Sequence, residues 1–306
     1  MSDRFEIVVI GGGAVGASIQ WHLASAGRTN SVLIEKHELT AGSTWHAAGN
    51  VPTFSNSWLG QRAGNYAWQI YSELAADSAD PITYRHTKAF WPGHTASRID
   101  HFHQLVGIAT GLGFDLQMVS PAEMEAMHPF WVDDGSVIAG LLDPYEGDID
   151  PSGLTQSLAR RSRAMGADLR RHSRVVDIDR LGPSDDARFR VSVESKGDRS
   201  TIDCDIVINA AGFYGAEVSA MLGVDAPLAV LEHQYLLTGP VPELDALTDT
   251  FPLVRDPEIE FYLRQENDRF LFGNYGHAGR TVWEDGKPDV FDSSLFAADD
   301  EGLVEV

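Results

Sequence analysis

The sequence predicts an α/β fold that opens with a βαβ unit. A β-branched run at residues 5–10 ends at a row of glycines, a helical period follows from Ala14, and a second β-branched run covers residues 31–35. Short apolar strands joined by a helix are typical of a buried parallel sheet. With 306 residues, the chain is long enough for two lobes that each bury a core.

Several helices are expected along the chain. In the first, Val15, Ile19, Leu23 and Ala26 lie on one face, and Gly27 is the predicted C-cap. Further helices are expected at residues 65–75, 97–113, 121–129, 154–166 and 216–223.

Two groups of strands are expected in the second half of the chain. The first group is β-branched with polar turns, and the second, rich in Tyr, Phe and Leu, is expected to form a second sheet. The acidic segment at residues 290–306 shows no helix or strand pattern. The first group covers residues 170–181, 188–195 and 200–212, and the second covers residues 231–239, 261–266 and 269–276.

The net charge of −22 argues against a nucleic-acid partner, because phosphate binding needs clustered Lys and Arg. We interpret the charge as a solvated acidic surface, with docking to a basic protein as the alternative. No run of about 18 apolar residues is present, so no membrane span is expected. A strand so close to the N-terminus leads us to expect no signal or transit peptide and a cytoplasmic location.

No metal or disulfide site is expected. The single cysteine, Cys204, lies in an apolar run and is interpreted as a small core residue. His101 and His103 are two residues apart, which is poor spacing for one helical face, and are expected at the surface. The acids of the loop before the helix at 154–166 fit no calcium pattern and are expected in turn and cap roles. These acids are Asp143, Asp148 and Asp150, with Asp150 as an N-cap before Pro151.

The glycine row matches a dinucleotide-binding fingerprint. Gly11, Gly13 and Gly16 have the G-x-G-x-x-G spacing between a strand and a helix, and Glu35 ends the next strand. Gly11 permits a tight turn, Gly13 lets the backbone approach a pyrophosphate, and Gly16 allows close packing of helix and strand. Glu35 can accept hydrogen bonds from an adenosine ribose.

FAD is favoured over a nicotinamide cofactor by the segment after the second strand. A nicotinamide dehydrogenase would continue with further βα units, whereas here GSTWHAAG occupies residues 42–49. The next strand of the same kind, VINAAG, comes only at residues 207–212. A nicotinamide dehydrogenase remains the minor alternative.

With these motifs, the sequence resembles the D-amino-acid-oxidase-like flavoproteins, especially their dimethylglycine and sarcosine dehydrogenase branch. The matching stretches follow the family's order and cover most of residues 5–277. GSTWHAAG and EHQY are specific to this branch. The full set is GGGAVG, SVLIEKHELTAGSTWHAAG, DPYEGDIDPSGLTQSLA, VINAAGFYGAEVSAMLG, EHQYLLT and FYLRQENDRFLFGNYG.

The resemblance implies a Rossmann-like FAD-binding domain of the glutathione-reductase type, interleaved with an α+β substrate domain built on a mainly antiparallel sheet. The FAD-binding domain is expected at residues 1–80 and 146–222, and the substrate domain at 81–145 and 223–306. The family's closing glycine-rich strand and helix find no match after Tyr275. We therefore expect a C-terminally truncated or split form, with a second chain as a possible source of the missing part.

The resemblance also implies that His46 can be bonded covalently to the flavin and that Trp45 and its small neighbours line the ring. It further suggests a backbone contact from Val175 to the adenine side and contacts from Gly212 and Tyr214. The predicted cofactor-binding residues are Gly11, Gly13, Ala14, Val15, Gly16, Glu35, Lys36, Gly42, Ser43, Thr44, Trp45, His46, Ala47, Ala48, Gly49, Val175, Gly212 and Tyr214.

For catalysis, the resemblance points to His233 and Tyr262, with Tyr235, Arg264 and Tyr275 as weaker substrate-binding candidates. His233 would accept or hold the amine proton, and Tyr262 would orient the amine or its carboxylate. The alternative for the tyrosines is packing on a sheet face.

The function implied is FAD-dependent oxidation of the C–N bond of a small N-methylated amino acid, such as dimethylglycine or sarcosine. Electrons would pass to an electron-transfer flavoprotein or to oxygen. The alternative is an inactive or split FAD-binding fragment that needs a second chain.

Overall fold

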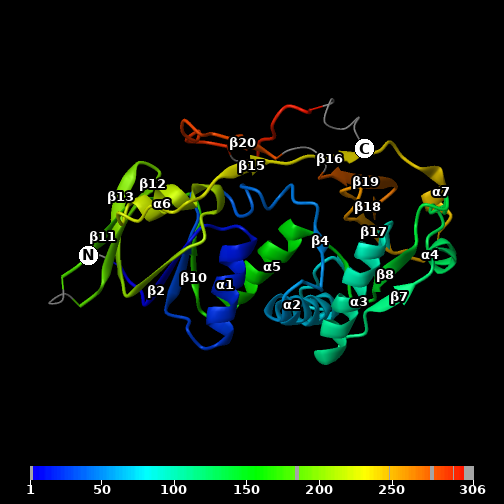
Figure 1. Ribbon diagram of the computed structural model, residues 1–306. Coiled ribbons are helices and arrows are strands. Elements are labelled where there is room, and N and C mark those ends of the chain that lie inside the picture. Colours follow the sequence, from blue (N-terminus) through cyan, green and yellow to red (C-terminus); the bar gives the residue numbers. More distant parts are fainter. Residues whose placement is uncertain (1–2, 183–185, 248, 276–278, 292, 300–306) are drawn as a thin grey trace. The chain divides into compact units, whose positions relative to one another are not determined.

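The computed structural model describes residues 3–182, 186–247, 249–275, 279–291 and 293–299 (Figure 1). The described residues pack as two compact units, and the chain passes between them several times. Unit 1 comprises Met1–Ala47, Asp150–Leu231 and Thr281–Phe296, and unit 2 comprises Ala48–Ile149, Glu232–Arg280 and Ala297–Val306.

Unit 1 contains a parallel sheet in the order β10-β3-β2-β14. Its strands are β2 (Ile7–Ile10), β3 (Ser31–Ile34), β10 (Asp168–Arg170) and β14 (Ile206–Asn209). Helix α1 (Ala14–Ser25) connects β2 to β3, which confirms the predicted βαβ unit.

One face of this sheet is covered by helices. α1 packs beside α5 (Pro151–Ala164) (Figure 1). Ile7, Val9 and Leu33 of the sheet lie in one buried cluster with Ala159 of α5. Asp150 caps α5 through a 2.9 Å bond from the Ser152 amide to its carboxylate, as predicted.

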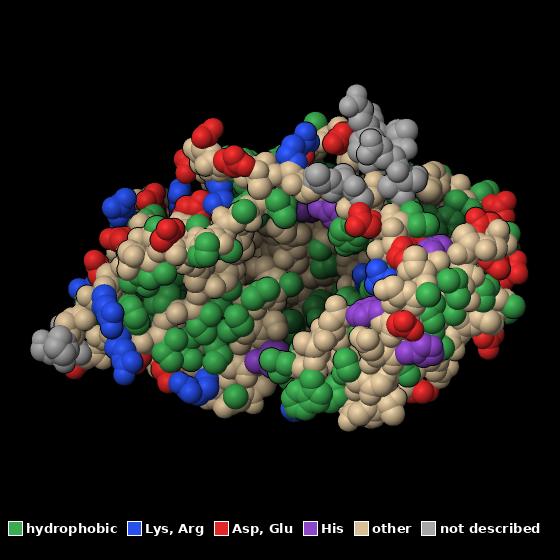
Figure 2. All heavy atoms as spheres, in the orientation of Figure 1, with side chains coloured by type: hydrophobic (Ala, Val, Ile, Leu, Met, Phe, Trp, Pro, Cys, Tyr) green, Lys and Arg blue, Asp and Glu red, His purple; other side chains and the backbone are tan. Residues whose placement is uncertain are grey.

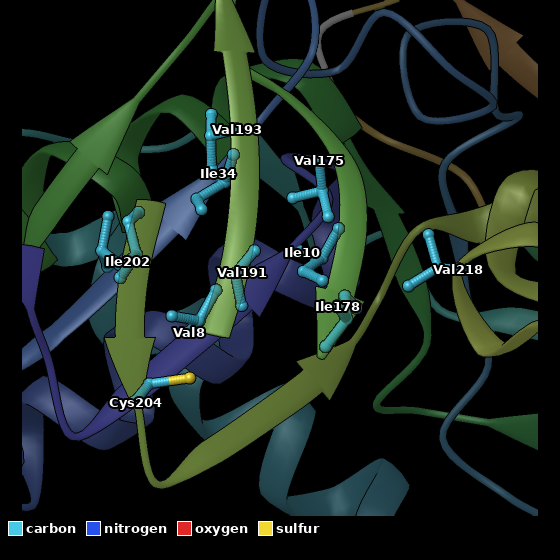
Figure 3. Packing of buried hydrophobic residues seen from close by; sticks show 11 residues of the cluster. Val8, Ile10, Ile34, Val175, Ile178, Val191, Val193, Ile202, Cys204 and Val218 are labelled. Carbon is cyan, nitrogen blue, oxygen red and sulfur yellow. The ribbon is translucent and has the colours of Figure 1, made fainter. Parts of the chain in front are cut away.

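The other face is covered by a second sheet in the order β1-β13-β12-β11. Because side chains alternate along a strand, Val8 and Ile10 point away from the helices and into this second layer. Figure 3 shows them directed toward Val191 and other side chains of the second sheet, and Cys204 belongs to the same buried cluster. Burial raises the pKa of Cys204 to about 12, so it is a core thiol, as predicted. The strands are β1 (Asp3–Arg4), β11 (Arg174–Arg180), β12 (Phe189–Ser195) and β13 (Asp198–Cys204).

Two of the predicted strands were wrong because each is divided between the two sheets of unit 1. The run at 170–181 breaks at His172, whose φ of 51° turns the chain from β10 into β11. The run at 200–212 breaks at Asp205, so β13 and β14 lie in different layers. After β14 come η1 (Gly212–Tyr214) and α6 (Gly215–Ala220).

Unit 2 is built on a seven-stranded sheet in the order β16-β19-β18-β17-β6-β8-β7. All neighbours pair antiparallel except β17 and β6, which are parallel, so the sheet is mainly antiparallel as predicted. Its strands are β6 (Ala89–Gly93), β7 (Gln117–Val119), β8 (Ala139–Asp143), β16 (Tyr235–Leu237), β17 (Leu253–Asp256), β18 (Phe261–Glu266) and β19 (Arg269–Asn274).

Helices α3 (Ala96–Gly111) and α4 (Pro121–Met127) pack against opposite faces of this sheet. Leu141 lies in a cluster with Phe102 of α3, whereas its neighbour Leu142 lies in a cluster with Met124 of α4. A smaller three-stranded sheet has the order β4-β9-β5, with β4 (Asn50–Val51), β5 (Tyr84–Arg85) and β9 (Gly147–Ile149).

Other predicted elements need adjustment. The helix expected at 65–75 is α2 (Trp58–Ala76), which begins earlier because Ser57 caps it by accepting a 3.0 Å bond from the Gly60 amide. The strand expected at 231–239 is interrupted at His233 and Gln234, giving β15 (Val230–Glu232) and β16. The remaining elements are α7 (Pro242–Asp245) and β20 (Arg280–Val282).

The compact units differ from the predicted domain ranges at residues 48–80 and 146–149, which pack in unit 2, and at residues 223–231 and 281–296, which pack in unit 1. Packing does not decide which residues bind which ligand, so the functional domain ranges stay a prediction. Acidic side chains are spread over the face shown in Figure 2, with Lys and Arg in small groups among them. In the part of the chain that is described, no helix is long and apolar enough to cross a membrane.

Candidate functional site

A cavity of about 290 Å³ lies in unit 1 at the carboxyl ends of β2, β3 and β14, where α1 begins. Crevices at this end of a parallel sheet are the usual ligand sites of doubly wound folds. Its lining comes from the glycine row, the end of β3, residues 42–44 and the turn after β14.

Glycines at the start of α1 are required by space. A Cβ on Gly16 would lie 1.9 Å from the Gly11 carbonyl oxygen, and one on Gly11 would lie 2.3 Å from the Ala210 carbonyl oxygen. Gly11 also has a φ of 111°, which side chains rarely allow. The close packing predicted for Gly16 is therefore present.

Glu35 braces this turn. Its carboxylate accepts a 2.7 Å bond from the Gly12 amide and a 2.8 Å bond from the His37 amide. A carboxylate has about four acceptor positions, so capacity remains for ribose hydroxyls. Gly12 lines the cavity but was not among the predicted cofactor residues, and a Cβ there would lie 2.7 Å from Leu39 and 2.9 Å from Glu35.

The N-terminus of α1 opens onto the cavity. Gly13 is its N-cap and has no side chain to cap the helix, and the next amide, of Ala14, donates a 3.1 Å bond to the Thr44 hydroxyl. Free amides at a helix N-terminus favour an anionic group such as a pyrophosphate.

Many of the predicted cofactor residues meet at this cavity. Within the described residues, its lining leaves out Gly16, Trp45, His46, Ala47, Ala48 and Gly49. The predicted residues that line it are Gly11, Gly13, Ala14, Val15, Glu35, Lys36, Gly42, Ser43, Thr44, Val175, Gly212 and Tyr214.

Additional lining residues were not predicted. Phe213 follows Gly212 directly, so its position beside the predicted contacts was the available signal. Phe291 lies in the acidic segment without a pattern, and nothing in the sequence marks it. Arg174 precedes Val175 at the start of β11 and also lines the cavity. At the cavity wall, the Lys36 ammonium lies 3.3 Å from the centroid of the Tyr214 ring.

His46 lies in the turn after the cavity residues. Its ring is half-buried and meets the Trp45 ring edge-on, with centroids 5.1 Å apart. Burial lowers the pKa of His46 below its ordinary value. The imidazole is therefore neutral at pH 7, with a nitrogen lone pair available.

In unit 2, the predicted catalytic tyrosine lies in one row across three strands. Tyr235 of β16 and Tyr262 of β18 both pair with Gly273 of the central strand β19. A Cβ on Gly273 would lie 2.1 Å from Tyr262 Cζ, so the ring lies across the glycine. Tyr262 is only 2% exposed, and burial raises the pKa of its phenol.

Next to this row, the His233 ring lies beside the Tyr275 ring. These rings stack with centroids 4.4 Å apart and an angle of 12° between the ring planes. The centroid of the Tyr275 ring also lies 5.4 Å from that of the Tyr262 ring. The backbone fixes this end of β19, because the Tyr275 amide donates a 2.6 Å bond to the Glu260 carbonyl. The structure thus brings His233, Tyr235, Tyr262 and Tyr275 together.

Arg264, the remaining substrate candidate, is 6% exposed and engaged by the protein. Its guanidinium donates to the Ala48 carbonyl and pairs with Glu266.

The acids of the nearby loop are also buried. Asp143 accepts bonds from Thr53 and the Tyr145 amide, a turn role as predicted, whereas Asp148 forms an ion pair with Arg85 rather than a turn.

An ion pair with a fully buried carboxylate, Arg255 with Glu146, lies beside them. Glu146 accepts a 2.6 Å bond from Arg255 Nε, yet burial raises its pKa to about 7. The Nη2 atom of Arg255 lies 2.5 Å from the same carboxylate but meets no hydrogen-bond geometry there. We therefore treat Nε as the donor. Among the described residues, no group of three metal-ligating side chains occurs.

Comparison with known proteins gives one family. The model of the family described as FAD dependent oxidoreductase (DAO) matches residues 6–299. Mitochondrial dimethylglycine dehydrogenase of Rattus norvegicus is 34% identical over 99% of this chain and 35% of its own length. Mitochondrial sarcosine dehydrogenase of Homo sapiens is 30% identical over 96% of this chain and 31% of its own length.

The chain therefore spans about a third of the length of these curated relatives. Among solved structures, L-proline dehydrogenase from P. horikoshii superposes with a TM-score of 0.79 at 23% identity. That match covers 90% of this chain and 71% of the other, and at this identity it shows a common fold.

Proposed function

Because the chain belongs to the DAO family of FAD-dependent oxidoreductases, we propose that it oxidises the C–N bond of a small N-methylated amino acid. The cofactor of this family is FAD. The substrate class rests on similarity to the dimethylglycine and sarcosine dehydrogenases at 34% and 30% identity.

The observation that carries the proposal is the glycine-rich turn of unit 1, at residues 11–16. Gly11 and Gly16 have no room for a Cβ, the N-terminus of α1 opens onto the cavity, and Glu35 retains acceptor capacity. These features fit the ribose and pyrophosphate of FAD. Bound FAD would supply the acceptor for the hydride that leaves the carbon next to nitrogen.

We assign the amine to the aromatic cluster of unit 2, which consists of His233, Tyr235, Tyr262 and Tyr275. His233 would take the ammonium proton, because hydride loss requires a free lone pair on nitrogen. Tyr262 would orient the amine, since its ring is fixed across Gly273 and its phenol stays protonated and able to donate. The stacked Tyr275 restricts the rotation of the His233 ring.

We also propose His46 as the covalent attachment point of the flavin. Its lowered pKa supports this, because an attacking imidazole nitrogen must be unprotonated. Attachment predicts that the yellow colour stays with the polypeptide after acid precipitation. In His46→Ala the flavin would be released by acid, and release from the wild type would contradict this assignment.

The activity is tested by anaerobic titration of the flavin-loaded protein with dimethylglycine and sarcosine. We expect loss of the oxidised flavin absorbance, with formaldehyde released on hydrolysis of the product. Glycine, which lacks the N-methyl group, is the matched control. Protein that stays colourless after reconstitution with FAD, or a flavin that no N-methylated amino acid reduces, would refute the proposal.

The electron acceptor belongs to the same proposal and is either an electron-transfer flavoprotein or oxygen. Reoxidation of the reduced protein distinguishes the two. If oxygen is the acceptor, air-saturated buffer restores the colour within the turnover time. If a flavoprotein is the acceptor, reoxidation is slow until that protein is added.

A second candidate is a binding chain that needs further polypeptide to complete its flavin site. It is favoured by β14, which lies at the edge of the parallel sheet with Ile206 40% exposed. An open strand edge accepts another strand. Flavin reduction by substrate in the chain alone would exclude this candidate.

A further inference from the structure

The chain enters unit 2 at Ala48, two residues after His46. The carbonyl oxygen of Ala48 accepts two hydrogen bonds from one side chain, Arg264 of β18. The Nε atom of Arg264 donates to this oxygen at 3.0 Å and Nη2 donates at 2.7 Å. Two parallel N–H donors from a rigid guanidinium fix the direction of the carbonyl as well as its position.

The rest of the guanidinium is engaged by unit 2. Nη1 donates to the Gln265 carbonyl at 2.9 Å, pairs with the Glu266 carboxylate, and lies 3.8 Å from Asp148 Oδ1. All three nitrogens of Arg264 thus have protein partners, and the side chain is 7% exposed. A substrate carboxylate would have to displace these bonds.

The backbone after Ala48 is also secured. The Ile149 amide donates a 2.8 Å bond to the Gly49 carbonyl, and Asn50 and Val51 then pair with β9. Arg264 therefore holds the first point of a segment whose following residues are already fixed. Loss of its bonds would free the chain toward His46 while β4 stays paired.

We propose that Arg264 is a positioning residue for the segment 46–49, which holds the flavin, and does not bind the substrate carboxylate. The assignment of the segment to flavin rests on the proposed function. The restraint itself rests on the bonds to Ala48. Arg264 lies two residues after Tyr262 on β18, so one strand carries a proposed amine contact and the restraint on the flavin segment.

The test compares Arg264→Lys with Arg85→Lys. Lysine at 264 keeps the positive charge beside Asp148 and Glu266 but loses the two-pronged donor. Arg85 pairs with the same two acids and does not contact Ala48, which makes it a matched control. Thermal unfolding of both variants establishes that each is folded, and Arg264→Gln serves if the lysine variant is not.

Hydrogen–deuterium exchange of residues 45–51 in the FAD-free chain is the first measurement. We expect about tenfold faster exchange in Arg264→Lys, because about one charge-assisted hydrogen bond is lost. We expect no change in exchange in Arg85→Lys. Flavin retained after gel filtration should fall by about half or more in Arg264→Lys only. The KM for dimethylglycine should stay within about twofold of the wild type.

Unchanged exchange in both substitutions at residue 264 would overturn the proposal. A raised KM with normal exchange and normal flavin retention would also overturn it, since that pattern belongs to a carboxylate-binding arginine. If the wild type binds no flavin, the proposed function fails, and the exchange result still decides whether Arg264 restrains this segment.

Discussion

The two candidate sites of this protein are built in different ways. The cavity of unit 1 is shaped by missing side chains and backbone amides, and half of its lining residues lie between residues 11 and 44. The aromatic cluster of unit 2 is shaped by side chains that meet where β16, β18 and β19 pair. The site in unit 1 depends on space for a backbone turn, and the site in unit 2 depends on the packing of aromatic rings.

This difference predicts different responses to substitution. A backbone turn with no free space cannot absorb an added atom, so unit 1 should lose folding and cofactor binding together. Rings can rotate or shift, so a change in the aromatic cluster should alter turnover with a smaller loss of stability. Two histidines of unit 2, the buried His128 and the partly exposed His94, add a dependence on pH.

The largest effect is expected for Gly16→Ala in unit 1. The new Cβ would lie 1.9 Å from the Gly11 carbonyl oxygen, so the turn must open. We expect a loss of about 3 kcal/mol in the free energy of unfolding and loss of flavin binding. Denaturant unfolding and flavin absorbance measure the two. Gly107→Ala, at an α3 position with nothing near its Cβ, is the control and should stabilise by up to about 1 kcal/mol.

A somewhat smaller effect is expected from acid on unit 2. His128 is buried among Phe90 and Phe251, and burial lowers its pKa to about 4. The unfolded chain, with a pKa near 6.5, binds the proton more tightly, so stability falls as pH drops from about 6.5 to 4. By pH 4.5 the loss is about 2.5 kcal/mol, and His128→Leu should remove this part of the pH dependence. Equal pH slopes in both proteins would contradict it.

Gly273→Ala should separate turnover from cofactor binding. Its Cβ would displace the Tyr262 ring, a movable side chain, so we expect kcat/KM to fall about 30-fold, or about 2 kcal/mol. Flavin content should remain normal because Gly273 neither lines the cavity of unit 1 nor makes the bonds to Ala48. Gly239→Ala, which meets nothing within 4 Å, should be neutral. A loss of flavin in Gly273→Ala would break the contrast between the two units.

The smallest effect is expected at His94, which bonds Asp256 at 2.7 Å. Burial opposes its charge, but the Asp256 bond and charge outweigh this and raise the pKa of His94. The pair therefore stabilises the fold below about pH 6.5, and this contribution disappears as pH rises through the raised pKa. His94→Gln should lose about 1 kcal/mol at pH 5.5 and little at pH 9, measured by denaturant unfolding. This pH slope is opposite to that of His128.

The sequence predicted unit 1 well because its signals are local. The strand, the glycine row, the helix and Glu35 fall within 31 consecutive positions, from residue 5 to residue 35, and each is placed by its neighbours. The break at His172 was missed because residues 170–174 are all polar, so no hydrophobic alternation is interrupted there. A short backbone turn at φ 51° leaves no mark in the hydrophobic pattern.

In unit 2 the sequence predicted fewer elements. Residues 89–93 were not assigned to a strand, because β6 is stabilised by pairing with β8 and with β17, far away in the chain. The family motifs singled out His233 and Tyr262. The role of Gly273 was not readable, since it depends on a ring from the neighbouring strand.

The parallel pair of β6 and β17 has a consequence for folding order. It consists of Leu253 with Ala89 and Val254 with Phe90, and it joins two antiparallel halves of the sheet. The first half, with β6, β7 and β8, is complete before residues 150–231 of unit 1 are synthesised. Pairing across such a sequence distance is slow. We therefore expect closure of this pair to limit the folding rate, leaving the edge of β6 exposed on the ribosome.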